Sequence, residues 1–102
     1  PVEYPEEQHS YLGFSLMVKP EAPFSRRDLT SFLHDCGIDT RPIMGGDLRK
    51  HPAFRNILSR SVSTPKTDEV FEQGFFVGLH TGVTQEISSY FVETMRAFLE
   101  RW

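Results

Sequence analysis

The chain has 102 residues, a length typical of one domain, and 38% of them are hydrophobic, an ordinary share for a globular protein. Eleven lysines and arginines stand against 14 aspartates and glutamates, which gives a net charge of −3. This balance argues against a nucleic-acid or anionic-membrane binder that works by general electrostatics. No apolar run approaches the roughly 20 residues that a membrane span needs.

The cysteine and aromatic contents bear on the cellular compartment of the chain and on its contacts with other domains. The single cysteine, Cys36, excludes an internal disulfide and favours a reducing, cytoplasmic location. Aromatic residues make up 13% of the chain, a large apolar load for so small a volume. We therefore expect part of this surface to face another domain or subunit. Because the chain begins at Pro1 without an initiator Met, it is either a processed protein or a fragment of a larger one, and we expect the fragment.

The N-terminal part combines an irregular segment with a strand. Residues 1–10 hold two prolines and no hydrophobic period, so they are predicted to lead into a single domain over residues 11–102. Residues 11–19 alternate apolar and polar side chains, which predicts a strand, and Pro20 ends it.

A helix is predicted after Pro23. Ser25 lies three residues before Asp28, the spacing of a capping box, and Gly37 supplies the left-handed residue that ends a helix. Its apolar stripe consists of Leu29, Phe32, Leu33 and Cys36. Burial in this stripe explains Cys36 better than nucleophilic chemistry does.

The middle of the chain is more broken. Residues 39–43 are predicted to be short and extended, and 44–47 to form a loop because of two successive glycines. Residues 48–58 have a partly helical pattern that Pro52 interrupts, and 60–66 are predicted to be a polar connector.

The last third predicts two helices around a strand. Residues 67–69 are expected to cap a short helix that stops at Gly74, and residues 75–79 form a strand. Thr84 caps a final helix that extends to about Trp102. The apolar face of this helix would contain Ile87, Tyr90, Phe91, Met95, Phe98 and Trp102. The element order predicts an α+β fold with a small sheet and helices packed on it.

The residues by themselves make no complete catalytic constellation. The four histidines and Cys36 have no zinc-like spacing, and no Ser-His-Asp arrangement is present, so we predict neither a metal site nor a catalytic residue. Gly45, Gly46 and Asp47 could offer backbone N–H groups to an anion or form a simple tight turn. Arg41 could bind a carboxylate or phosphate with its guanidinium or face solvent at a sheet edge.

Several strings, taken in order, carry a family resemblance that spans nearly the whole chain. They are SYLGF at 10–14, SRRDL at 25–29, GIDTRP at 37–42, GGDLRKHPAF at 45–54, TPKTD at 64–68 and VGLHTGVT at 77–84. With these strings the chain resembles the C-terminal small domain of the DegT/DnrJ/StrS-type sugar aminotransferases, pyridoxal-phosphate (PLP) enzymes of fold type I. It is most similar to the branch that contains the CDP-sugar 3-dehydrases and acts in lipopolysaccharide biosynthesis.

The resemblance implies both a fold and a function. The fold would be a three- to four-stranded, mostly antiparallel sheet with helices packed on one face. The function would be that of one domain in a nucleotide-sugar aminotransferase or dehydratase that acts on keto-deoxyhexoses. A missing N-terminal domain of the same protein would bind PLP and supply the Schiff-base lysine, or a histidine in the dehydrase branch. The whole enzyme would be a homodimer, and this fragment alone would be inactive.

The resemblance also implies a substrate-binding role for particular residues. Arg41 would hold an anionic group of the substrate or amino donor. The loop residues Gly45, Gly46 and Asp47, with Arg49, would shape the nucleotide-sugar entrance. Tyr11 and Leu12 would form an apolar wall. The alternative from the residues alone is a free-standing α+β ligand-binding or regulatory module without catalysis.

Overall fold

A computed structural model describes residues 5–6, 10–60 and 63–102 of the chain. The described part holds three strands, three α-helices and two short 3-10 turns. In chain order these are β1 (Gly13–Met17), α1 (Arg26–Asp35), β2 (Thr40–Pro42), η1 (Leu48–Lys50), η2 (Pro52–Phe54), α2 (Pro65–Gln73), β3 (Gly74–Gly78) and α3 (Gln85–Leu99). Residues 1–4 and 7–9 of the predicted lead-in segment lie outside the described residues, so that prediction stays open.

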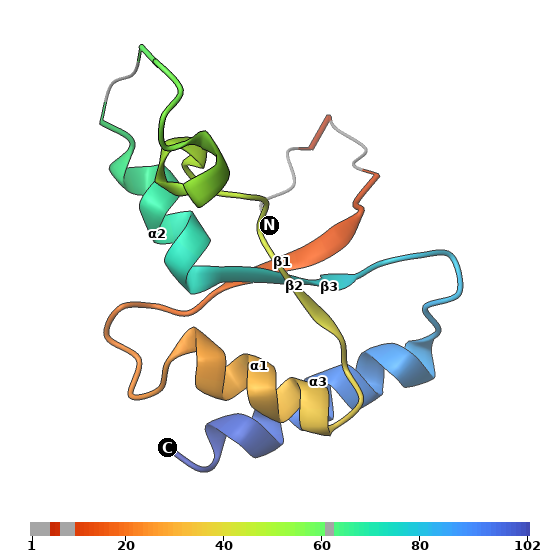
Figure 1. Cartoon of the computed structure of the whole chain (residues 1–102). Coiled ribbons are helices and arrows are strands. Elements are labelled where there is room, and N and C mark those ends of the chain that lie inside the picture. Colours follow the sequence, from red (N-terminus) through yellow and green to blue (C-terminus); the bar gives the residue numbers. More distant parts are fainter. Residues whose placement is uncertain (1–4, 7–9, 61–62) are drawn as a thin grey trace.

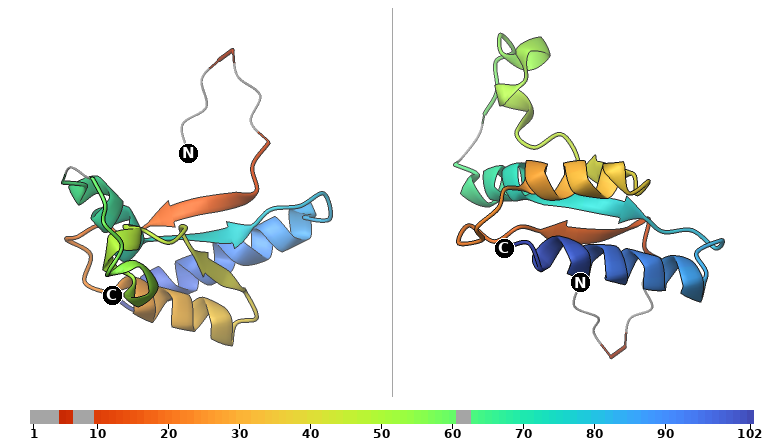
Figure 2. Two further views of the ribbon diagram at one scale, coloured as in Figure 1. Left: turned by 45° about the horizontal axis from the view of Figure 1, so that its top comes forward. Right: turned by 90° about the horizontal axis from the view of Figure 1, so that it is seen from below.

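The three strands form one antiparallel sheet in the order β1-β3-β2, with β3 in the centre. Helices α1 and α3 lie side by side on one face of this sheet (Figures 1 and 2). The rings of Phe32 in α1 and Phe98 in α3 are 5.3 Å apart and join the two helices. The predicted α+β class, with an antiparallel sheet and helices on one face, is confirmed.

The core lies between the sheet and these two helices. Its buried hydrophobic side chains are Val18, Leu29, Leu33, Phe75 and Phe98, of which Leu33 and Phe75 are the most deeply buried. Phe14, Leu16 and Val77 point to the same side of the sheet as Phe75, because alternate residues of a strand share a face. The apolar alternation predicted from residues 11–19 therefore selects the face that the helices cover, although only Gly13–Met17 is regular strand.

Helix α1 begins and ends as the sequence predicts. The Ser25 hydroxyl accepts a hydrogen bond from the backbone N–H of Asp28, and the Asp28 carboxylate accepts one from the Ser25 N–H. The Ser25 hydroxyl also donates to the Asp28 carboxylate at 2.7 Å, and this hydrogen bond, together with the one from the Ser25 N–H, lowers the pKa of Asp28. At the other end Gly37 has φ +77°, and the N–H of Ile38 bonds to the Leu33 carbonyl at 2.9 Å, which completes a Schellman motif.

The start of α2 differs from the prediction. The helix begins at Pro65, inside the predicted polar connector, and its N-cap Thr64 makes no side-chain capping bond. Proline is favoured at the first helical position, where its fixed φ suits the helix and no N–H is needed. The proline therefore starts the helix, and residues 67–69 form part of its first turns rather than its cap.

Helix α2 passes into the central strand without a connecting loop. Gly74 ends the helix and is the first residue of β3, and it is buried. A Cβ atom at Gly74 would lie 2.5 Å from the Val70 carbonyl oxygen and 2.8 Å from Ile43 Cδ1. The guanidinium of Arg26 donates to the carbonyls of Phe71 at 2.7 Å and Gly74 at 3.0 Å, which ties α1 to this junction.

Helix α3 is only partly buried. The Thr84 hydroxyl accepts a hydrogen bond from the Ile87 N–H, so the predicted N-cap is confirmed, while the helix ends at Leu99. Phe98 is buried and Phe91 and Met95 pack against the core, but Ile87, Tyr90 and Trp102 remain about half exposed. The predicted apolar face is wider than the surface that the sheet and α1 cover.

Two glycines of β3 give a matched test of the helix–strand junction. We expect Gly74→Ala to lower the free energy of unfolding by about 1–3 kcal/mol, since its Cβ would press on backbone. Gly78→Ala in the same strand meets nothing within 4 Å and should change stability by less than about 0.5 kcal/mol. Urea unfolding of both variants measures the difference. Equal midpoints would mean that the junction tolerates a side chain.

Candidate functional site

In the part of the chain that the structure describes, Ser15 and Arg41 are exposed on the sheet face opposite α1 and α3, which we call the open face. Ser15, Phe76 and Arg41 lie side by side on it, because directly paired residues of an antiparallel ladder point to the same side. Figure 1 shows the segment that contains η1 and η2 rising above this face, on the side away from α1 and α3. The open face and this segment are the parts of the fold on which the predicted site residues lie.

Arg41 lies in β2, at an edge of the sheet. Its guanidinium Nη2 is 2.9 Å from Asp39 Oδ2, and the side chains are 69% and 67% exposed. An ion pair so exposed contributes at most about 1 kcal/mol. Arg41 is therefore held only loosely.

Leu12, which precedes β1, is one wall of a small pocket on the open face. The pocket has a volume of about 160 Å³ and is lined by Leu12, Gly13, Ser15, Ile43, Met44 and Phe76. A Cβ at Gly13 would lie 2.4 Å from the Phe76 ring, so the glycine lets that ring lie across the strand. Leu12 is 76% exposed, and Tyr11, its neighbour, is 36% exposed.

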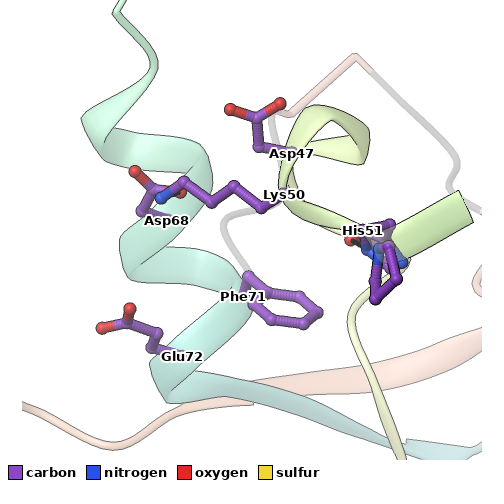
Figure 3. Close-up of a pocket in the computed structure, with 8 residues that line it drawn as sticks. Asp47, Lys50, His51, Asp68, Phe71 and Glu72 are labelled. Atoms are coloured by element: carbon purple, nitrogen blue, oxygen red, sulfur yellow. Dashed lines mark hydrogen bonds and ion pairs between the residues drawn. The ribbon is translucent and has the colours of Figure 1, made fainter. Parts of the chain in front are cut away.

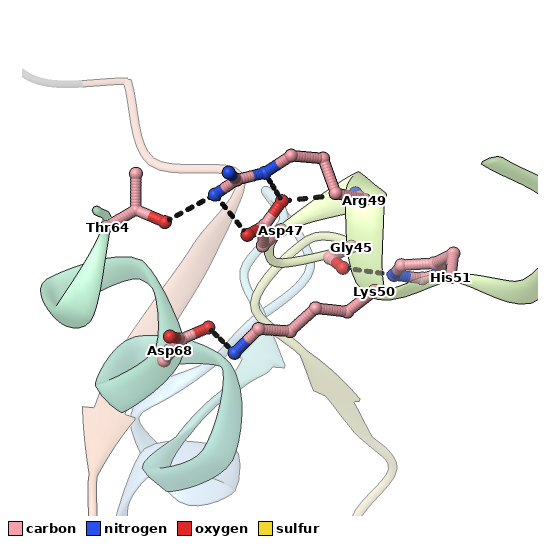
Figure 4. Close-up of polar contacts among 7 residues, drawn as sticks. All are labelled: Gly45, Asp47, Arg49, Lys50, His51, Thr64 and Asp68. Atoms are coloured by element: carbon pink, nitrogen blue, oxygen red, sulfur yellow. Dashed lines mark hydrogen bonds and ion pairs between the residues drawn. The ribbon is translucent and has the colours of Figure 1, made fainter. Parts of the chain in front are cut away.

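Asp47 and Arg49 bind each other. Arg49 Nε donates to Asp47 Oδ1 at 2.7 Å and Nη2 donates to Oδ2 at 2.5 Å, in a bidentate pair (Figure 4). Asp47 also caps η1 by accepting from the Arg49 N–H. The hydrogen bond from Arg49 lowers the pKa of Asp47, and the same contact raises the pKa of Arg49. Arg49 Nη2 lies 3.4 Å from Thr64 Oγ1 at the start of α2.

Gly45 and Gly46 have different structural roles. Gly46 has φ +66°, and a Cβ there would lie 2.7 Å from the Phe71 ring of α2. Gly45 has neither a positive φ nor a close contact with Phe71, and its carbonyl is hydrogen-bonded to His51 Nε2. The predicted loop at residues 44–47 is therefore present, and its close approach to Phe71 of α2 is what requires the second glycine.

A larger pocket of about 300 Å³ separates this loop from α2 (Figure 3). Its lining residues are Gly45, Asp47, Lys50, His51, Pro52, Asp68, Phe71 and Glu72. Lys50 extends from η1 to α2, where its ammonium lies 2.6 Å from Asp68 Oδ1, and this contact raises the pKa of Lys50. The rings of His51 and Phe71 lie 6.3 Å apart, also between loop and helix.

The seven predicted site residues do not form one cluster in the described part of the chain. Gly45 and Asp47 line the larger pocket, Leu12 lines the smaller one, and Arg41 lies beside Phe76 on the open face. Sequence reasoning did not single out Lys50, Asp68 or Phe71. Lys50 and Asp68 both occur in strings that carry the resemblance, but nothing in their 18-residue separation predicts a contact.

The described lysines do not fit the role of a Schiff-base lysine. Such a lysine needs a lowered pKa, so that its amine is free to attack. Asp68 instead raises the pKa of Lys50, Glu69 raises that of Lys66, and Lys19 is exposed. Within the described residues there is also no group of three or more His, Cys, Asp or Glu side chains that could hold a metal ion. None of the described helices is long and apolar enough to cross a membrane.

Comparison with known proteins identifies the family. The DegT/DnrJ/EryC1/StrS aminotransferase family matches residues 1–96. The chain belongs to this family. It is 32% identical over 102 residues to a dTDP-4-dehydro-2,6-dideoxy-D-glucose 3-dehydratase of Saccharopolyspora spinosa, covering 99% of the chain and 22% of that protein. It is 32% identical over 90 residues to the lipopolysaccharide biosynthesis protein RfbH of Salmonella typhimurium, covering 87% and 21%.

Solved structures agree with this assignment. A variant of ColD superposes with a TM-score of 0.70 at 28% identity, over 81% of this chain and 22% of that one. A GDP-4-keto-6-deoxymannose-3-dehydratase with a trapped PLP-glutamate geminal diamine superposes with a TM-score of 0.66 at 27% identity, over 78% and 21%. The chain therefore spans about a fifth of the length of these relatives, and the predicted family resemblance is confirmed.

The two loop glycines provide a matched pair of variants. Gly46→Ala should destabilise the loop by about 1–2 kcal/mol, because alanine resists a positive φ and its methyl would strike Phe71. Gly45→Ala meets only side-chain atoms at 3.4 Å or beyond and serves as the control. Limited proteolysis after residue 49 reports loop opening. Equal cleavage rates in the two variants would show that Phe71 does not restrict the loop.

The Asp47–Arg49 pair should make stability depend on pH. The pKa of Asp47 is below its ordinary value of 3.8, so its contribution is complete above that value and is lost as the pH falls through the lowered pKa. We expect Asp47→Asn to flatten the loss of stability below about pH 5. Urea unfolding at several pH values measures this.

The partner variant is the control for that experiment. Arg49→Ala should also reduce the loss of stability at acid pH. The double variant should add little to either single change, because both substitutions remove the same interaction. Additive effects would show that the two side chains act independently.

Proposed function

We propose that this chain is the C-terminal small domain of a PLP-dependent nucleotide-sugar dehydratase or aminotransferase that acts on keto-deoxyhexoses in deoxysugar or lipopolysaccharide biosynthesis. Family membership over residues 1–96 is the observation that carries the proposal. The names of two dehydratase relatives support it, because each specifies a deoxyhexose linked to a nucleotide. The small share of each relative that this chain covers supports a larger partner domain.

In this proposal the open sheet face looks toward the larger domain and the substrate. The helices already cover the other face, and apolar side chains such as Leu12, Met17 and Met44 remain exposed. Exposed apolar surface of this kind is typical of a face that packs against another domain or a ligand. Homodimer formation and a cytoplasmic location are further parts of the proposal.

The residues of this chain would bind and orient rather than catalyse. Arg41 would exchange its exposed partner Asp39 for an anionic group of the nucleotide sugar, to which a guanidinium can donate two parallel hydrogen bonds. Loop residues 45–49 would form one side of the entrance, and Tyr11 and Leu12 would form an apolar wall that excludes water from the sugar. PLP and the groups that hold it would come from the larger domain, since the described lysines do not fit that role.

A substitution at Arg41 tests the proposal in the full-length enzyme. Arg41→Ala should raise the KM for the nucleotide sugar about tenfold, because a charge-assisted partner worth about 1.5 kcal/mol is lost. The substrates to try are GDP-4-keto-6-deoxy-D-mannose and dTDP-4-dehydro-2,6-dideoxy-D-glucose. Arg27→Ala, an exposed arginine of α1 on the opposite side of the sheet, is the matched control. A KM within twofold of the unsubstituted enzyme for Arg41→Ala would remove the open face from the substrate site.

A further inference from the structure

Helix α2 is fixed to the core at its C-terminal end. Arg26 of α1 donates to the carbonyls of Phe71 and Gly74, two of the acceptors that a helix end leaves without intrahelical partners. Gly74 continues directly into the central strand, where Phe75 is buried. The helix therefore has a fixed position relative to the sheet.

The other contacts of α2 hold the loop. Asp68 binds the ammonium of Lys50, the Phe71 ring packs on Gly46, and Thr64 at the helix start meets Arg49. Figures 3 and 4 show these side chains spanning the space between η1 and α2. Each contact joins residues at least 15 positions apart, so each restricts the loop relative to the core.

The hydrogen bonds within the loop segment itself are local. The backbone N–H groups of Lys50, His51, Phe54 and Ile57 all bond to carbonyls three residues earlier. Such bonds fix the shape of each turn but not its position over the sheet. The position has to come from contacts that cross to another element. Between the described residues of this segment and α2, the Lys50–Asp68 pair is such a contact, at 2.6 Å.

We propose that α2 positions the loop of residues 44–51 for substrate binding, with Lys50 and Asp68 as a pair of positioning residues. The inference rests on the proposed function, in which residues 45–49 of this loop form one side of the substrate entrance. Without the ion pair the loop occupies its binding-competent position for a smaller fraction of the time. The apparent affinity for substrate falls in proportion to the fraction of time that the loop is in this position, whereas the chemical step is unchanged.

The test is a charge swap in the full-length holoenzyme. Asp68→Asn should raise the KM for the nucleotide sugar about two- to fivefold and leave kcat within twofold, the range expected for a partly exposed ion pair. The double variant Lys50→Asp, Asp68→Lys restores the pair with reversed charges and should restore the KM. Glu69→Gln is the matched control, because it breaks the Lys66–Glu69 pair of 2.8 Å, which stays within α2.

A second measurement does not depend on the substrate. Amide hydrogen exchange in residues 44–51 should be faster in Asp68→Asn than in Glu69→Gln, and the charge swap should slow it again. The proposal is overturned if Asp68→Asn behaves like Glu69→Gln in both measurements, or if the swap restores neither. If Arg41→Ala leaves the KM unchanged while the exchange result holds, the proposed function fails but the loop restraint stands.

Discussion

The direct passage of α2 into β3 at Gly74 is the constraint on which the rest of the structure depends. β3 pairs with both other strands, so the position at which it begins sets the register of the whole sheet. The absence of a side chain at Gly74 allows the last turn of the helix to reach the strand without a loop. Arg26 satisfies the carbonyls at this point and brings α1 to the same place. One junction therefore fixes the relative positions of α1, α2 and the sheet.

That junction also determines which residues of β3 lie on each face of the sheet. With β3 in place, Phe75 and Val77 point into the helical layer, and Phe76 points to the open side with Arg41 and Ser15. A shift of one residue in register would exchange these two sets and put Phe76 into the core. The chemistry available on the open face is thus a consequence of the same packing that forms the core.

The local signals of the fold were predictable, and the contacts between distant segments were not. Ser25, Gly37 and Thr84 mark helix ends because their bonds are made within a few residues of the chain. The start of α2 was missed because the proline signal at Pro65 competes with the polar residues around it. For the site, the two successive glycines predicted the loop at residues 44–47, but only the structure shows that Gly46 faces Phe71. The Lys50–Asp68 pair has no periodic signature, since its partners come from different elements.

The two arginines predicted for the site differ in how firmly each is held. Arg49 makes a bidentate pair with Asp47, and the Asp47 carboxylate also caps η1 by accepting from the Arg49 N–H, so removing Asp47 loses both the pair and the cap. Arg41 makes one exposed contact with Asp39, which a ligand can replace at little cost. An anion that approached Arg49 would have to compete with a carboxylate already in place, whereas at Arg41 it meets a guanidinium that is largely in water. Of the two side chains, Arg41 is therefore the one whose guanidinium a ligand could reach at little cost, whereas Arg49 is already paired within the loop segment.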